Sequence, residues 1–457
     1  MDVIDSMSAS KDTKQGTPLE QKDFPPYFVR EQLLIRLLMT YIGTGVFFML
    51  LPGTFLGVWN LFAISGGHSP QAVPDSWIQA HGHAQLFGWI GTFILGIGFY
   101  SIPNLRKVAS FNFQEAWVIL VLWATGVAIR WVSNVYQWQW RLLIPVSAIL
   151  EIVAFLGFFY FSFKGYRAKS TQARSVELWV LLVLSGCVGL LASLVFNLVE
   201  CFDLSLHAIV PAIPQAVDHR YLFLSTWGFA VPIAWGLTAR WMPPLLGLKE
   251  SKKTCLYAAL STNVLAVISA VAGFPLQAAC LSILAAALIP LGLRLFEPTA
   301  SAAKTSGVHV TFPVFMRIAY IWVIVAAALQ LWAAFGINTE GISGAARHAL
   351  TVGFLATMVF TVGPRMLPAF LGRKQLYSGK LMFASLALLS LGCLLRVSFE
   401  VLAYQHYLSW AWTVLPVSAS LELLAVTLFG VNMIATLRQP PLMPVMDEAY
   451  AASKKKK

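Results

Sequence analysis

The sequence predicts an all-α polytopic membrane protein in which twelve transmembrane helices form three pseudo-repeated units of four helices. Three observations lead to this fold class: the composition, the spacing of the apolar runs and the return of one histidine motif. Of the 457 residues, 58% are hydrophobic and 11% are charged, and the mean hydropathy is +0.71. This balance excludes an ordinary soluble domain. The five cysteines form no CxxC pair, which excludes a disulfide framework and the attachment motif of a c-type haem.

Twelve apolar runs are long enough to cross a bilayer, because a helix rises about 1.5 Å per residue and the hydrocarbon core is about 30 Å thick. The runs divide a single membrane domain into units 31–170, 171–305 and 306–438. We expect a disordered cytoplasmic tail at 1–30 and a basic cytoplasmic tail at 439–457. The runs are 33–58, 77–103, 113–133, 141–163, 176–199, 219–243, 254–273, 275–295, 313–335, 345–368, 380–402 and 409–436.

The positive charges predict how these helices are oriented. Clusters of Lys and Arg precede the first run and follow every second run, always on the side of the N-terminus, whereas the opposite loops are acidic or neutral. Cytoplasmic loops of membrane proteins carry an excess of Lys and Arg, so both termini are expected in the cytoplasm. These loops also account for the formal net charge of +12, which therefore gives no reason to expect nucleic-acid binding.

A histidine motif opens the second and the tenth runs. His83 and His348 are each followed by Ala, by Gly five residues later, and by Pro twenty residues later. His81 precedes the first copy by two residues, and His219 opens the sixth run, which is the second helix of the middle unit. Imidazole is costly in lipid and is an excellent metal ligand. The motif therefore predicts ligands at the outer helix ends, while a satisfied, interior-facing polar residue remains the alternative for any one of them.

The repeat extends to charged residues inside the third and fourth helices of the outer units. Arg130 corresponds to Arg396, and Glu151 corresponds to Glu422. One interpretation makes each Arg–Glu pair an internal ion bridge. A second has the arginines hold haem propionates by two-point contacts, and a third makes the glutamates part of a proton route. Parallel repeats also build transporters, so the symmetry alone does not select a function.

A twelve-helix bundle with histidines at the outer ends of the second, sixth and tenth helices resembles subunit I of the haem–copper oxidases. The His-x-His-x-x-x-x-Gly-Trp run at 81–89 resembles the haem-ligating helix of b-haem oxidases and nitric oxide reductases. Over nearly the whole chain the sequence is more similar to the NnrS family, shorter relatives described as haem- and copper-containing membrane proteins tied to nitric oxide stress. Unlike the oxidases, this chain has no adjacent His pair in its seventh run and one His in its tenth.

The resemblance implies specific roles for these residues. His83 and His348 would be the axial ligands of a b-type haem, and Arg130 and Arg396 would be candidates for binding it. His81 and His219 would be candidates for a copper ion or a second haem. An iron held by two imidazoles has no open position for a substrate, so it transfers electrons or senses.

The resulting hypothesis is a haem-binding, copper-binding protein of the bacterial inner membrane that serves the nitric oxide response or redox homeostasis. Its partners would be the lipid bilayer, a small gas such as nitric oxide, and an electron donor. In its enzymatic form it would be an oxidoreductase acting on that gas. Two alternatives are a metal-free, proton-coupled secondary transporter and a factor that holds haem or copper during assembly.

Overall fold

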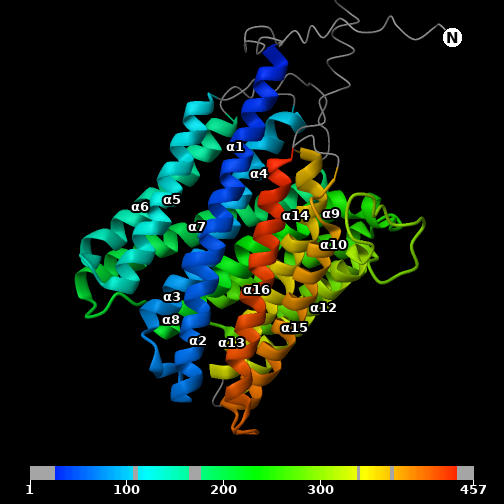
Figure 1. The fold of residues 1–457 in the computed structure, drawn as a ribbon. Helices are drawn as coiled ribbons and strands as arrows, with labels where there is room; N and C mark the ends of the chain where they lie inside the picture. The colour runs from blue at the N-terminus through cyan, green and yellow to red at the C-terminus, as the bar shows by residue number, and fades with distance from the viewer. Residues whose placement is uncertain (1–25, 107–111, 164–175, 337–339, 371–374, 440–457) are drawn as a thin grey trace, which may run out of the picture.

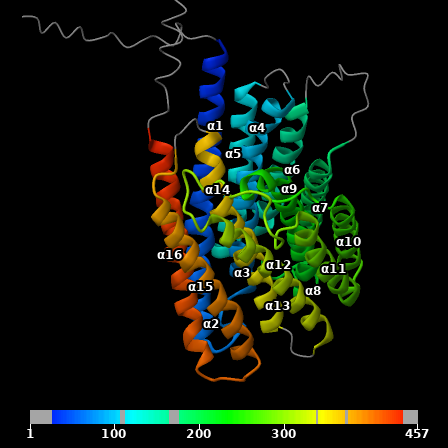
Figure 2. The same ribbon diagram turned by 90° about the vertical axis from the view of Figure 1, so that its right-hand side faces the viewer.

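The computed structural model describes residues 26–106, 112–163, 176–336, 340–370 and 375–439, and these residues form helices and no strands. Twelve of the helices are long and apolar enough to cross a membrane, so the predicted all-α polytopic fold class is confirmed. They pack into one elongated bundle (Figures 1 and 2). The predicted tails fall largely outside the described residues.

We number the twelve membrane-length helices as spans one to twelve in chain order. Span one combines two α-helices and a π-helical segment: α1 (Pro26–Phe48), η2 (Met49–Phe55) and α2 (Leu56–Gly67). A short turn, η3 (Pro70–Ala72), leads into span two. Eight spans are single helices: α5 (Phe113–Tyr136), α6 (Trp140–Phe163), α7 (Leu178–His207), α10 (Lys253–Val271), α11 (Pro275–Leu293), α12 (Phe312–Phe335), α15 (Gly379–Tyr404) and α16 (Ala411–Arg438).

Local capping fixes several helix boundaries. The side chain of Asn112 accepts a hydrogen bond from the backbone N–H of Gln114 at the start of α5, and Ser378 accepts one from Leu381 at the start of α15. Such caps satisfy donors that have no partner inside the helix. Span six ends at Gly247, whose φ of +64° is a left-handed conformation that glycine adopts without steric cost.

Spans two, six and ten share one unusual architecture. Each begins with an α-helix of nine residues, continues as a π-helical segment and returns to an α-helix. The first helices, α3, α8 and α13, lie in the lower half of Figure 1, away from the N-terminal trace. In order, the three spans are α3 (Asp75–His83), η4 (Ala84–Gly91) and α4 (Thr92–Arg106); α8 (Gln215–Phe223), η5 (Leu224–Ala230) and α9 (Val231–Leu246); and α13 (Glu340–His348), η6 (Ala349–Ala356) and α14 (Thr357–Phe370).

This architecture defines the register of the three units. His83, Phe223 and His348 are the last residues of the nine-residue helices, and a glycine follows each of them five residues later. Span six is thus the counterpart of spans two and ten, as its His suggested. His219 itself, however, lies four residues before the equivalent position, which is occupied by Phe223.

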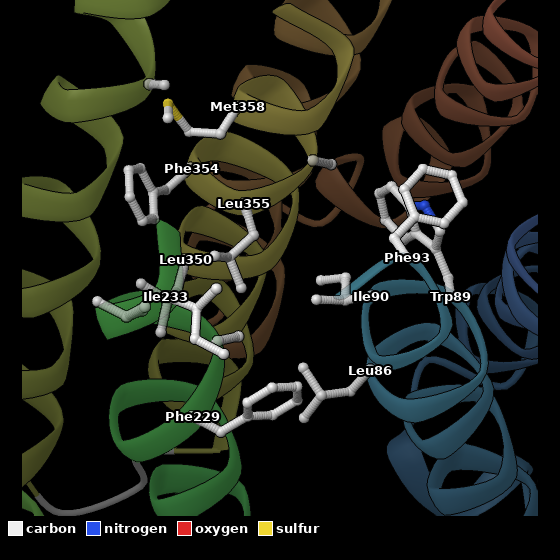
Figure 3. Packing of buried hydrophobic residues seen from close by; sticks show 14 of the residues in the cluster. Leu86, Trp89, Ile90, Phe93, Phe229, Ile233, Leu350, Phe354, Leu355 and Met358 are labelled. Carbon is white, nitrogen blue, oxygen red and sulfur yellow. The ribbon is translucent and has the colours of Figure 1, made fainter. Parts of the chain in front are cut away.

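The three π-helical segments face one another across a buried apolar core. Leu86 and Ile90 of η4 point toward Phe229 of η5 and Leu355 of η6 (Figure 3). His83 and His348 directly precede η4 and η6, at one end of this core.

The internal repeat is also visible where the third and fourth helices of the outer units meet. A Cβ atom on Gly126 would lie 2.8 Å from Cγ of Glu151, and a Cβ atom on Gly392 would lie 2.8 Å from Cγ of Glu422. Each glycine therefore makes room for the glutamate of the neighbouring helix. The repeat-equivalent glutamates occupy equivalent places in the helix pairs α5–α6 and α15–α16.

Candidate functional site

His81 is held against span one. Its Nδ1 lies 2.9 Å from the carbonyl oxygen of Gly53 in η2. The ring also covers Gly57, where a Cβ atom would lie 2.5 Å from Cε1 of His81. A carbonyl oxygen only accepts hydrogen bonds, so in the neutral ring Nδ1 carries the hydrogen and Nε2 keeps its lone pair.

His348 is held in a similar way at the end of α13. Its Nδ1 lies 2.9 Å from the carbonyl oxygen of Gly344, one turn earlier, and 3.3 Å from Oε2 of Glu400 on α15. The other carboxylate oxygen of Glu400 lies 3.5 Å from Nη2 of Arg396. Because the carbonyl of Gly344 only accepts, the hydrogen of His348 is on Nδ1, which again leaves Nε2 as the free lone pair.

The two histidines lie within electrostatic range of each other. His81 interacts electrostatically with both His348 and Arg396, although these residues come from spans two, ten and eleven. Within the described part of the chain, neither Nε2 atom has a hydrogen-bond partner. We call His81, His348, Arg396 and Glu400 the two-histidine site.

Several buried polar atoms at this site are unsatisfied. Nη1 of Arg396, Oε2 of Glu400 and Oε1 of Glu422 are buried without a hydrogen-bond partner among the described residues. Oε2 of Glu400 is within ion-pair distance of His348, but no hydrogen bond to it forms. Unpaired polar atoms buried at membrane depth are costly. Their concentration beside two imidazoles with free lone pairs marks a polar group of side chains inside the bundle.

His83 points elsewhere and has a different partner. Its Nε2 lies 2.8 Å from Oε1 of Glu151, and its ring stacks on Phe87 with ring centroids 4.7 Å apart. Both His83 and Glu151 are buried. Residues two apart on a helix face different directions, so His81 and His83 cannot both point at one neighbour. In this arrangement the Nε2 of His83 is not free to bind a metal.

The charged residues of the repeat do not pair as the ion-bridge interpretation predicts. Arg130 lies with Nη1 2.6 Å from Sγ of Cys201, while Glu151 is paired with His83. Arg396 is paired with Glu400, and Glu422 is within electrostatic reach of it. The predicted Arg130–Glu151 and Arg396–Glu422 bridges are therefore wrong, because nearer partners take Glu151 and Arg396.

His219 lies away from the two-histidine site. Its side chain is exposed on α8, and it interacts electrostatically with Arg347. A copper ion would need further ligands beside His81 or His219, and the described residues contain no group of three or more His, Cys, Asp or Glu side chains placed to hold a metal ion.

Glu400 and the glycines were not identified from the sequence. Glu400 follows Arg396 by four residues on a predicted helix, a spacing that places two side chains on the same face, and this signal could have revealed the pair. Gly53, Gly57 and Gly344 carry no chemical signal, because they act through a carbonyl oxygen or through an absent side chain.

Comparison with known families gives one match. A family model described as NnrS protein matches residues 39–440, which include all four members of the two-histidine site. No curated protein matches the chain.

Proposed function

Because the chain belongs to the NnrS family, we propose that it is an integral membrane haem protein in which His81 and His348 are the axial ligands of a b-type haem. We infer a role in the nitric oxide response or in redox homeostasis. One observation carries the proposal: each of these two imidazoles donates its Nδ1–H to a backbone carbonyl, which leaves its Nε2 free, and His81 interacts electrostatically with His348. Metal-ligating histidines are oriented by this kind of hydrogen bond.

The proposal transfers the axial role from His83 to His81. The sequence motif contains both residues and cannot distinguish them, but the Nε2 of His83 is bonded to Glu151. The propionate-binding role falls to Arg396, whose buried Nη1 has no partner among the described residues. Arg130 directs its Nη1 to Cys201 instead. A guanidinium matches a carboxylate in a two-point contact.

The residues around the two histidines set the properties of the site. A bis-imidazole haem supplies one-electron transfer and leaves no open position for a substrate. Glu400 and the carbonyl of Gly344 both face Nδ1 of His348, whereas His81 has a carbonyl alone. His348 would therefore be held by more polar contacts than His81.

The membrane-spanning helices suggest a lipid bilayer as the environment of the protein. From the distribution of Lys and Arg we propose that both termini face the cytoplasm of a bacterial inner membrane. An electron donor and nitric oxide are the partners that the proposed function requires.

The test is a visible absorption spectrum of the protein purified in lipid nanodiscs. The wild type is expected to show the Soret band of a low-spin b-type haem. His81→Ala and His348→Ala should each remove or strongly shift this band. His83→Gln is the matched control, because glutamine can still donate to Glu151 but cannot ligate iron.

Several results would contradict the proposal. Loss of the band in His83→Gln with retention in His81→Ala would return the axial role to His83. Haem-free wild-type protein that takes up solute under a pH gradient would instead favour a proton-coupled transporter, an alternative for which the buried carboxylates Glu151, Glu400 and Glu422 would supply proton sites. Metal analysis of the same samples would test copper, and transfer of haem to an acceptor protein would indicate an assembly factor.

A further inference from the structure

A cavity of about 120 Å³ lies among spans six to ten, separate from the two-histidine site. A site for one water needs about 10–15 Å³ by this measure, so the cavity holds on the order of ten water-sized atoms. Helices α8 and α13 supply most of its polar lining, and α12 and η5 supply the rest. The polar lining residues are His219, Arg220, Thr226, Gln330, Ser343 and Arg347.

Two guanidinium groups, those of Arg220 and Arg347, line this cavity. Within the described part of the chain, neither Arg220 nor Arg347 makes a hydrogen bond or an ion pair through its side chain. The Arg220 guanidinium lies over the turn at Gly273, where a Cβ atom would be 3.1 Å from Nη2. Two carboxylates outside the cavity lining, those of Asp218 and Glu400, interact electrostatically with Arg347. The described residues that line the cavity include two guanidinium groups and no carboxylate, so the lining itself is positive.

The rest of the lining is apolar. Phe223, Trp227 and Leu350 face the cavity together with small residues such as Ala278 and Ala326. Phe223 takes the register position that His83 and His348 occupy in the other units. The middle unit thus has an apolar wall where the outer units have an imidazole.

We propose that this cavity binds a small planar oxyanion of the carboxylate type. A guanidinium offers two parallel N–H donors that match the two oxygens of a carboxylate or a nitrate. Ser343 adds a hydroxyl group, whereas the hydroxyl of Thr226 donates to the carbonyl of Leu222. The apolar wall accommodates a short hydrocarbon chain on the anion. The volume excludes large ligands. The cavity shares no lining residue with the two-histidine site, because Arg347 points about 100° away from His348 around the same helix.

The experiment measures anion binding to the full chain in nanodiscs by saturation-transfer NMR of propionate, with nitrate as competitor. Arg220→Gln and Arg347→Gln should each weaken propionate binding about tenfold or more, as expected for the loss of a charged hydrogen-bond donor. Ala326→Leu should block binding without changing any charge. Arg141→Gln is the control, because Arg141 directs its guanidinium to the carbonyls of Ser205 and Ala208.

The outcomes separate the sources of the anion. Tighter binding of propionate than of nitrate identifies an organic carboxylate as the ligand, and equal binding identifies an inorganic oxyanion. The proposal is overturned if propionate and nitrate give no saturable signal, or if both glutamine variants and Ala326→Leu bind like the wild type. An unchanged melting temperature in these variants establishes that they fold.

Discussion

His81 and His83 are two residues apart, yet the fold gives them different tasks. His81 faces span one and the tenth and eleventh spans, whereas His83 faces Glu151 on α6. At the residue scale, function depends on which ring nitrogen remains free after the local hydrogen bonds form. Nδ1 is bonded and Nε2 is free in His81 and His348, whereas Nε2 is the bonded nitrogen in His83.

The carboxylate of Glu400 should tune His348. In Glu400→Gln, the negative charge beside Nδ1 of His348 is removed while the shape is kept. The ferric state loses the stabilisation that this negative charge provides. We therefore expect the haem midpoint potential to rise by tens of millivolts and haem affinity to fall by roughly tenfold. A redox titration in nanodiscs measures this. Glu151→Gln removes the same charge beside His83 and should leave the potential near that of the wild type; equal shifts in both variants would contradict the assignment.

The His83–Glu151 pair should matter for stability and not for the cofactor. In His83→Phe, Glu151 loses its partner at a fully buried position, which should destabilise the protein by roughly 1–3 kcal/mol. His83→Phe combined with Glu151→Leu should recover most of that loss, because the unpaired carboxylate is gone as well. Thermal unfolding in detergent measures both. If the double variant is less stable than His83→Phe alone, the unpaired carboxylate of Glu151 is not the cause of the lost stability.

At the scale of helices, the π-helical segments mark the functional end of the bundle. η4 and η6 begin directly after His83 and His348, and η2 supplies the carbonyl that orients His81. A π-helical turn leaves the ordinary i to i−4 bonding pattern and is frequent at functional sites. Here it also changes the direction in which the following side chains of each span point into the core.

The close approach of spans one and two should be required for haem binding. In Gly57→Ala, the new methyl group would lie within 2.5–2.7 Å of two atoms of the His81 ring, so the ring must move away from Gly53. We expect reduced haem occupancy and a shifted Soret band. Gly43→Ala, in the same span, meets nothing within 4 Å and should match the wild type. Normal haem content in Gly57→Ala would show that the position of His81 is not critical.

At the scale of the whole molecule, the sequence predicts the architecture better than the site. Apolar run length and the charge of the loops depend on single segments, so twelve spans and the repeat could be read directly. The partners of Glu151 and Arg396 could not be predicted from the sequence, because several charged groups lie near each of them. The rotation of the helices decides which of these groups forms the pair. The π-helical segments change the rotation of the helix that follows them. No residue pattern in 84–91 or 349–356 predicts these segments.

The stoichiometry of the cofactor follows from how the three units differ. Each unit has one position at the end of its nine-residue helix, and the three positions hold His83, Phe223 and His348. The first is bonded to Glu151 and the second has no ligand atom, so only the third combines with His81 to form an axial pair. We therefore expect one b-type haem per chain from a pyridine haemochrome assay normalised to protein mass. A ratio of two would require a second pair of ligands, and it would assign a haem to His83 in place of its bond to Glu151.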